Sequence, residues 1–143
     1  MAVARFKGRC DATDLRDADG YPGPLGWTHI SDGEVIPFIG INCDGIRIFL
    51  QQALIKMPDP VRTSVYARAV ARVMAHELYH VFARTAKHGS SGIAKSAYCA
   101  EELLSSRFRF NKKQSDVLRA YGDHLSTMFP EGAGDMGRDQ AAR

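Results

Sequence analysis

The sequence predicts an α+β domain in which strands come first and helices follow. Residues 34–43 are a run of β-branched and aromatic side chains, which favours a strand. Residues 61–85 contain no glycine or proline and repeat apolar side chains at helical spacing, which predicts one long helix. A chain of 143 residues, 45% of them apolar, fits a single hydrophobic core. We therefore expect one domain over residues 1–129 and a disordered tail at 130–143, where large apolar side chains are scarce.

Three segments before the long helix have the composition of strands: residues 3–6, 25–30 and 34–43. The chain between the first two is turn-rich, and Ser31-Asp32-Gly33 predicts a turn into the third. Pro37 cannot donate a hydrogen bond within a sheet, so we expect residues 34–43 to form an edge strand. Such an edge could align an extended substrate by strand addition, or it could simply be a protected edge.

Four segments predict helices: residues 46–56, 60–86, 100–108 and 112–128. A turn at Asp44-Gly45 precedes the first of them. Asp59 and Pro60 resemble an N-cap followed by proline at the first helical position, and Asn111 can cap the last helix. Four arginines are assigned to the solvated side of the long helix: Arg62, Arg68, Arg72 and Arg84.

Charge and hydropathy argue against two classes of partner. The net charge of +3 and the cluster Arg107, Arg109, Lys112 and Lys113 are weak compared with the dense basic stripe of a nucleic-acid surface, so no nucleic-acid partner is expected. No apolar run approaches the length of about 18 residues that a membrane span needs, so no membrane partner is expected.

The cysteines and the N-terminus leave the compartment open. Cys10, Cys43 and Cys99 are odd in number and widely spaced, which indicates neither a zinc knuckle nor a complete disulfide framework. The first residues contain no apolar h-region, so a signal peptide is expected to be absent or already removed. Both a cytoplasmic location and secretion after processing remain possible.

The long helix carries the motif His76-Glu77-Leu78-Tyr79-His80. Two histidines four residues apart lie on one helix face, one turn from each other, and can share a metal ion. Glu77 projects beside that face, where it can accept a proton from metal-bound water. Zinc suits this set because it binds imidazole, tolerates an open fourth position and lowers the pKa of bound water to about 7.

A catalytic zinc site needs a third protein ligand. His88 lies eight residues after His80, about 12 Å along a continuous helix, so it can coordinate only if the chain leaves the helix and folds back. Gly89 and Gly92 make that path plausible. The alternatives are Glu101 and Glu102 on the following helix. We prefer His88 to Glu101, and Glu101 to Glu102.

The motif resembles that of the zincin metallopeptidases, and a third histidine after the helix is similar to the metzincin branch. The metzincin positions for glycine and the third histidine hold Ala83 and Ala86 here. A closer resemblance is to small uncharacterised bacterial proteins with predicted zinc-protease domains. They share the histidine eight residues past the motif and a Gly-aliphatic segment, here Gly92-Ile93-Ala94-Lys95; Ala94 stands where some of them have methionine.

This resemblance implies a small mixed sheet over the active-site helix and a zinc metallopeptidase that cleaves a peptide or protein substrate. Glu77 would act as general base, and a second donor would stabilise the oxyanion. Tyr98 is the first choice for that donor, ahead of Lys95 and Tyr79. Two alternatives stay open: a non-peptidase zinc hydrolase of amides or esters, and a non-catalytic module that zinc stabilises. The sequence does not predict an oligomeric state.

Overall fold

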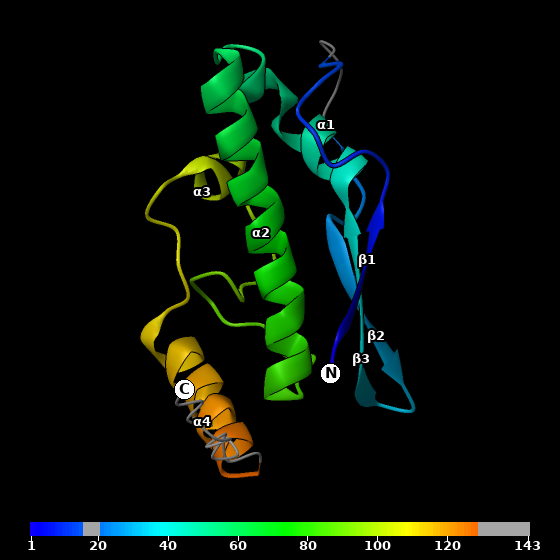
Figure 1. The fold of residues 1–143 in the computed structure, drawn as a ribbon, viewed down its shortest axis with the longest axis vertical. Coiled ribbons are helices and arrows are strands. Elements are labelled where there is room, and N and C mark those ends of the chain that lie inside the picture. Colours follow the sequence, from blue (N-terminus) through cyan, green and yellow to red (C-terminus); the bar gives the residue numbers. More distant parts are fainter. Residues whose placement is uncertain (16–20, 129–143) are drawn as a thin grey trace, which may run out of the picture.

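The computed structural model describes residues 1–15 and 21–128 and has the predicted α+β architecture (Figure 1). Its elements are β1 (Val3–Lys7), β2 (Gly26–Ser31), β3 (Glu34–Asn42), α1 (Cys43–Leu54), α2 (Asp59–Ala83), α3 (Ala100–Leu104) and α4 (Lys112–Met128). The tail expected at 130–143 lies outside the described residues. Within the described part, no helix is both long and apolar enough to cross a membrane.

The three strands form a mixed sheet with the order β1-β3-β2. β3 runs parallel to β1 and antiparallel to β2, so the expectation that residues 34–43 form an edge strand is wrong. Pro37 is tolerated in this central strand because the pairing with β1 begins only at Phe38 and the register with β2 shifts between Thr28 and Ile30. The edges of the sheet are β1 and β2.

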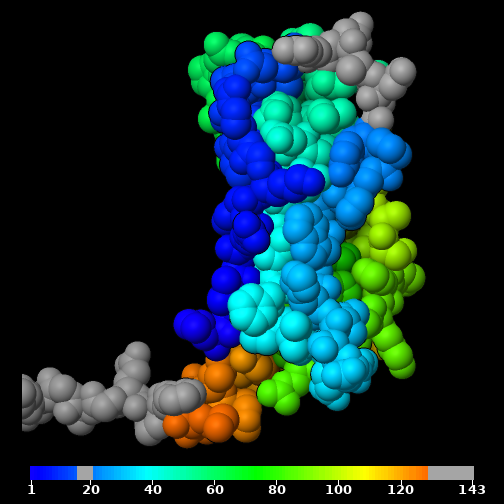
Figure 2. Space-filling view, turned by 90° about the vertical axis from the view of Figure 1, so that its right-hand side faces the viewer, coloured from blue at the N-terminus to red at the C-terminus, as the bar shows by residue number. Residues whose placement is uncertain are grey.

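The core lies between the sheet and α2, which stands between the sheet on one side and α3 and α4 on the other (Figure 1). Alternate residues of β3, Ile39 and Ile41, are buried together with Val73 of α2 and Leu50 of α1. The opposite face of the sheet carries exposed apolar side chains, and β1, β3 and β2 lie uncovered on the face of the molecule in Figure 2. The sheet therefore buries one face only, and that face is turned to α2.

The helix boundaries differ from those expected because backbone conformation ends each helix. α2 begins at Asp59 and has Pro58 as its N-cap, without a side-chain cap bond. It ends at Ala83, because Arg84 adopts the left-handed conformation (φ 48°, ψ 46°). α3 ends at Leu104 and not at Phe108, because Ser105 is extended (ψ 141°).

Arg72 is buried (7% exposed), so its assignment to the solvated side of α2 is wrong. Its guanidinium donates to the carbonyl of Leu103 at 2.6 Å and lies 5.7 Å from the centroid of the Phe108 ring. Arg62 likewise donates to the carbonyl of Leu54, the last residue of α1, and to that of Met57 just after it. Both guanidinium groups are therefore held by backbone carbonyls at or next to a helix end.

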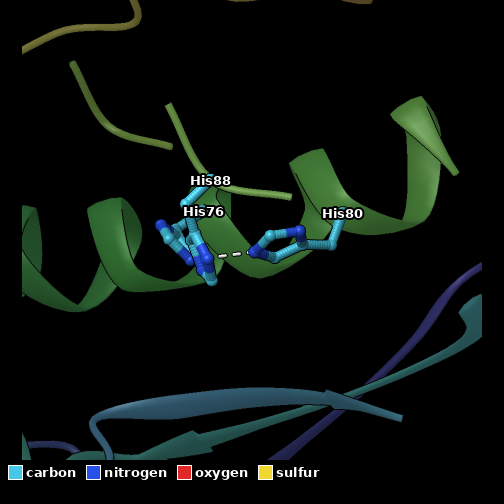
Figure 3. Close-up of side chains that lie close together, drawn as sticks. All are labelled: His76, His80 and His88. Atoms are coloured by element: carbon cyan, nitrogen blue, oxygen red, sulfur yellow. Dashed lines mark hydrogen bonds between the residues drawn. The ribbon is translucent and has the colours of Figure 1, made fainter. Parts of the chain in front are cut away.

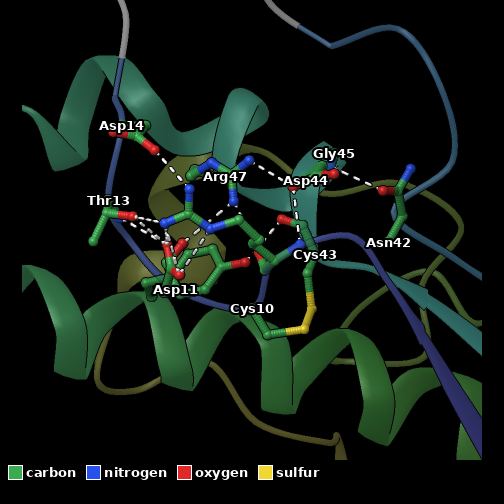
Figure 4. A network of polar contacts seen from close by, with 11 residues as sticks. Cys10, Asp11, Thr13, Asp14, Asn42, Cys43, Asp44, Gly45 and Arg47 are labelled. Atoms are coloured by element: carbon green, nitrogen blue, oxygen red, sulfur yellow. Dashed lines mark hydrogen bonds and ion pairs between the residues drawn. A yellow bond between two sulfur atoms is a disulfide. The ribbon is translucent and has the colours of Figure 1, made fainter.

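Cys10 and Cys43 form a disulfide that the cysteine spacing did not indicate (Figure 4). Cys43 is the first residue of α1, and the Asn42 side chain caps that helix by accepting the N–H of Gly45 at 3.0 Å. The turn expected at Asp44-Gly45 is therefore the first turn of a helix. The disulfide fastens the segment after β1 to the junction of β3 and α1. Cys99 is the one free cysteine of the chain.

Candidate metal centre

His76 and His80 project from the same face of α2, one helical turn apart (Figure 3). Both side chains are buried, with 7% and 5% of their surface exposed. Their Nε2 atoms lie 3.0 Å apart. For comparison, two nitrogens bound at about 2.05 Å to a tetrahedral ion lie about 3.3 Å apart. The motif therefore brings two ligand atoms to nearly the separation that zinc requires.

Backbone carbonyls fix the tautomer of both rings. His76 Nδ1 donates to the carbonyl of Ile93 at 2.8 Å, and His80 Nδ1 donates to the carbonyl of Thr85 at 2.6 Å. A carbonyl can only accept, so each neutral ring has its proton on Nδ1 and an unprotonated lone pair on Nε2. Two lone pairs that face each other repel unless a cation lies between them. Hydrogen bonds from Nδ1 to carbonyls also typically orient metal-binding histidines.

His88 comes to the pair from the segment between α2 and α3 (Figure 3). The left-handed Arg84 turns the chain out of the helix, as ligation by this residue requires. The His88 ring centroid lies 5.2 Å from that of His76 and 4.7 Å from that of His80. One ligand atom from each of the three histidines fits within 4.8 Å of the others, and His88 is the exposed member.

Burial keeps the two motif histidines neutral. Desolvation lowers the pKa of His76 and of His80, because an imidazolium ion loses hydration inside the protein. Neutral imidazole is the form that binds a metal. The three imidazoles, two of them held unprotonated at Nε2, thus form a group that could hold a metal ion, and its nitrogen donors are of the kind that zinc binds.

Glu77 borders the same site and is held by the edge strand β2. The Thr28 hydroxyl donates to its Oε2 at 2.7 Å, and burial raises the pKa of the Glu77 carboxyl. Gly26 makes this close approach possible, because a Cβ there would lie 2.8 Å from Val73 Cγ1 and 2.9 Å from Glu77 Oε1. The carboxylate is therefore fixed between the helix and the sheet.

Tyr98 lies at the site with its hydroxyl 2.6 Å from His76 Nδ1. The same hydroxyl donates to the carbonyl of Ile93, and burial raises the pKa of the phenol. The other two candidates for an oxyanion donor have different partners. Lys95 forms an ion pair with Glu102, and the Tyr79 ring lies 5.9 Å from that of Phe110.

Glu101 and Glu102, the alternative third ligands, lie apart from the histidine cluster. Glu101 is exposed. Glu102 accepts the backbone N–H of Cys99 at 3.0 Å and pairs with Lys95, which holds the pKa of its carboxyl below the ordinary range. Of the three candidates weighed from the sequence, the structure brings only His88 to His76 and His80.

A hollow of about 420 Å³ opens over the histidines and Glu77. Its wall combines the edge strand β2 with parts of α1, α2 and the segment before α3. Among the described residues of its wall, the ionisable groups are the three histidines, Glu77 and two tyrosines, Tyr21 and Tyr98. Its apolar wall includes Leu25, Trp27, Ile30, Val35, Phe49 and Val73.

The structure adds residues to the site that sequence reasoning missed. Thr28 and the carbonyl of Ile93 contact the motif directly, and Gln114 contacts the segment that carries His88. Thr28 and Ile30 are two residues apart in β2, and this spacing could have suggested that the threonine shares the face of the apolar Ile30. No sequence pattern identifies the Ile93 carbonyl, because a backbone acceptor depends only on the path of the chain.

No family model matches the chain, and neither the curated proteins nor the solved structures include a match to it. The resemblance to zincin metallopeptidases therefore stays a prediction from the motif. The function has to follow from the histidines, Glu77 and the hollow above them.

Proposed function

We propose that the chain is a zinc-dependent metallopeptidase with His76, His80 and His88 as metal ligands. The observation that carries this proposal is the pair of Nε2 atoms 3.0 Å apart, each on a ring whose Nδ1 already donates to a carbonyl. Three histidine ligands leave the fourth position of a tetrahedral ion for substrate or water. Zinc bound there would supply Lewis acidity and make water nucleophilic near neutral pH.

Glu77 is the general base of this proposal. Its carboxylate is buried beside the two motif histidines and is held by the Thr28 hydroxyl. Burial raises the pKa of this carboxyl, which makes it a stronger base than an exposed glutamate. Glu77 takes the proton of the attacking water and passes it to the leaving amine. A merely structural zinc site has no use for such a group.

Two features favour a polypeptide as substrate. In the described part of the chain β2 pairs only with β3, and the hollow over the histidines is lined by Gly26, Trp27 and Thr28 of β2. An extended peptide can add to such an edge through backbone hydrogen bonds. The sequence assigned substrate alignment at a sheet edge to residues 34–43, and we now assign it to β2. The apolar wall of the hollow suits large apolar side chains near the scissile bond.

A second hollow of about 570 Å³ adjoins the first along α1. The two hollows share Tyr21 and Phe49 in their walls, and the second reaches Lys56. Two neighbouring hollows offer contacts to a chain molecule that a small amide or ester would not use. This supports a peptidase over the alternative of a small-molecule hydrolase.

Metal analysis of the purified protein tests the site itself. We expect about one equivalent of zinc in the wild type and a large loss in His88→Ala, because two histidines alone bind zinc weakly. Glu101→Ala is the matched control and should retain its zinc. Wild-type protein that takes up no zinc when it is supplied would rule out the proposal. Loss of zinc in Glu101→Ala but not in His88→Ala would assign the third ligand to Glu101.

Hydrolysis of a mixture of unstructured peptides, read by mass spectrometry, tests the activity. Glu77→Gln should abolish cleavage and keep zinc bound, because the amide cannot accept the proton. Cleavage that persists in Glu77→Gln would contradict the assigned base. Zinc binding without any cleavage by the wild type would favour a non-catalytic module.

A further inference from the structure

The segment between α2 and α3 carries His88 with little regular structure of its own. Gly89 N–H donates to the carbonyl of Ala94 at 2.8 Å, and Lys95 N–H donates to that of Gly92 at 3.3 Å. These bonds close a short loop over residues 89–95. A loop with so few internal bonds depends on its surroundings for a fixed shape.

The first turn of α4 lies against this loop. Asn111 caps α4 by accepting the N–H of Gln114 at 2.9 Å, and Gln114 Oε1 accepts the N–H of Asn111 at 3.1 Å. This reciprocal pair is a capping box. Gln114 differs from a usual surface cap because only 3% of it is exposed. Its remaining hydrogen-bonding capacity is used inside the protein.

Gln114 bonds to both sides of the loop. Its Nε2 donates to the carbonyl of Ser91 at 2.8 Å, and the N–H of Ala94 donates to its Oε1 at 3.4 Å. Asn111 Nδ2 adds a second bond to the Ser91 carbonyl at 3.2 Å. One buried amide therefore joins the start of α4 to two points of the loop.

The loop is shaped to this side chain. A Cβ at Gly89 would lie 2.7 Å from Gln114 Nε2, and a Cβ at Gly92 would lie 2.6 Å from Gln114 Oε1. Gly92 also adopts φ +73°, which larger residues rarely do. Glycine is thus required at residue 92, and at residue 89 a side chain would displace the amide of Gln114.

The loop leads directly to two of the histidines. His88 precedes Gly89 in the chain, and Ile93 precedes Ala94. The carbonyl of Ile93 accepts His76 Nδ1 at 2.8 Å, and its N–H donates to the carbonyl of Arg109 at 3.1 Å. A displacement of this loop would move the third ligand and release the ring of the first.

We propose that Gln114 is a positioning residue of the metal site: it holds the loop that carries His88 and the Ile93 carbonyl, and so sets the affinity for zinc. This inference rests on the proposed zinc site and assigns to α4 a part in it. Gln114 touches neither the metal ligands nor the hollow above them. Outer partners of metal ligands typically change affinity about 10- to 100-fold when they are removed.

Zinc affinity of the full chain, measured by competition with a chromophoric chelator, tests the inference. Gln114→Leu removes both bonds to the loop and should weaken zinc binding about 10-fold, the lower end of the range for direct partners of metal ligands, because Gln114 acts through the loop. Gln51→Leu is the matched control, because Gln51 is also buried (5% exposed) but lies on α1. It should lower the free energy of unfolding without changing zinc affinity. Hydrogen exchange of the Gly89 and Ala94 amides in metal-free Gln114→Leu should be faster than in the wild type.

Gln114→Glu decides the question if the leucine variant does not fold. A carboxylate keeps the capping box but places an acceptor oxygen against the Ser91 carbonyl, so zinc affinity should still fall more than in Gln51→Leu. Wild-type affinity in the folded Gln114 variants, or an equal loss in Gln51→Leu, would overturn the positioning role and leave the proposed function standing. A wild type that binds no zinc would overturn both.

Discussion

The Nε2 atoms of His76 and His80 face each other 3.0 Å apart on one face of α2. Both ring protons are held at Nδ1 by the carbonyls of Ile93 and Thr85. The folded chain therefore carries a local repulsion that a cation would turn into an attraction. Metal binding should therefore stabilise the folded state, and the unfolding temperature is a direct way to measure it.

Zinc should raise the unfolding temperature of the protein. At a free concentration 100 times the Kd, a ligand that binds only the folded state stabilises it by about 2.7 kcal/mol. For a domain of this size that corresponds to a shift of about 10 °C. Differential scanning calorimetry with and without a chelator measures the shift, and His80→Ala should abolish it. An unchanged unfolding temperature in wild type at saturating zinc would count against the site.

Thr28 should matter for hydrolysis and not for metal binding. Its hydroxyl donates to Glu77 Oε2 at 2.7 Å and contacts no histidine among the described residues. A hydrogen bond to a charged group contributes about 1.5–3 kcal/mol, so Thr28→Val should lower kcat about 10-fold or more. Thr28→Ser keeps the hydroxyl and should retain most of the activity. Zinc content should be unchanged in both; a parallel loss of zinc in Thr28→Val would mean that the strand itself had moved.

Tyr98→Phe separates two roles for the phenol. The hydroxyl lies 2.6 Å from His76 Nδ1, which suggests that it helps to orient that ring. We expect the substitution to weaken zinc binding by about 10-fold, within the range for outer partners of a metal ligand. If Tyr98 instead turns to the substrate as the oxyanion donor expected from sequence, kcat should fall about 100- to 1,000-fold at unchanged zinc affinity. Chelator competition and steady-state kinetics on the same preparation distinguish the two results.

The motif could be predicted from sequence because helix geometry alone sets its spacing. His76, Glu77 and His80 need only a regular α-helix to come together, and α2 (Asp59–Ala83) is one. His88 can approach the other two histidines only if the helix ends before it. Gly89 and Gly92 indicated that the chain could fold back there. The left-handed Arg84 that causes the turn has no comparable sequence signal.

Other features depend on contacts between distant segments and could not be predicted. Pro37 suggested an edge because strand order cannot be deduced from one strand, and β3 became central only when β1 paired beside it. Arg72 belongs to a pattern of arginines that suggests a solvated face. It is buried because the end of α3 supplies a carbonyl acceptor. Cys10 and Cys43 are 33 residues apart, and only the folded chain brings them together.

Reduction of the disulfide should destabilise the protein without removing the site. A bridge that spans 33 residues restricts the unfolded chain, and the loop-closure model gives about 3–4 kcal/mol for this length. The surrounding polar contacts remain, including Arg47 with Asp44 at 2.5 Å and with the carbonyl of Arg9 at 2.8 Å (Figure 4).

Urea unfolding of the oxidised protein and of Cys10→Ser measures the difference in the free energy of unfolding. Cys99→Ser, which alters the free cysteine, should unfold like the wild type. Equal stability of the oxidised protein and Cys10→Ser would show that the bridge contributes nothing.

Tyr66 should make stability fall above pH 10. Its hydroxyl donates to the carbonyl of Cys43 at 2.8 Å, and burial raises the pKa of the phenol from 10.0 to about 12. Below pH 10 the phenol is protonated in both states, so its contribution is complete. As the pH rises towards 12 the unfolded chain loses this proton first, and the free energy of unfolding decreases.

Tyr66→Phe should be less stable at pH 8 by about 1 kcal/mol, because it lacks the hydrogen bond, and its stability should fall less steeply above pH 10. Urea unfolding of both proteins at pH 8, 10 and 11 tests this, and parallel curves would mean that Tyr66 ionises as readily when folded as when unfolded.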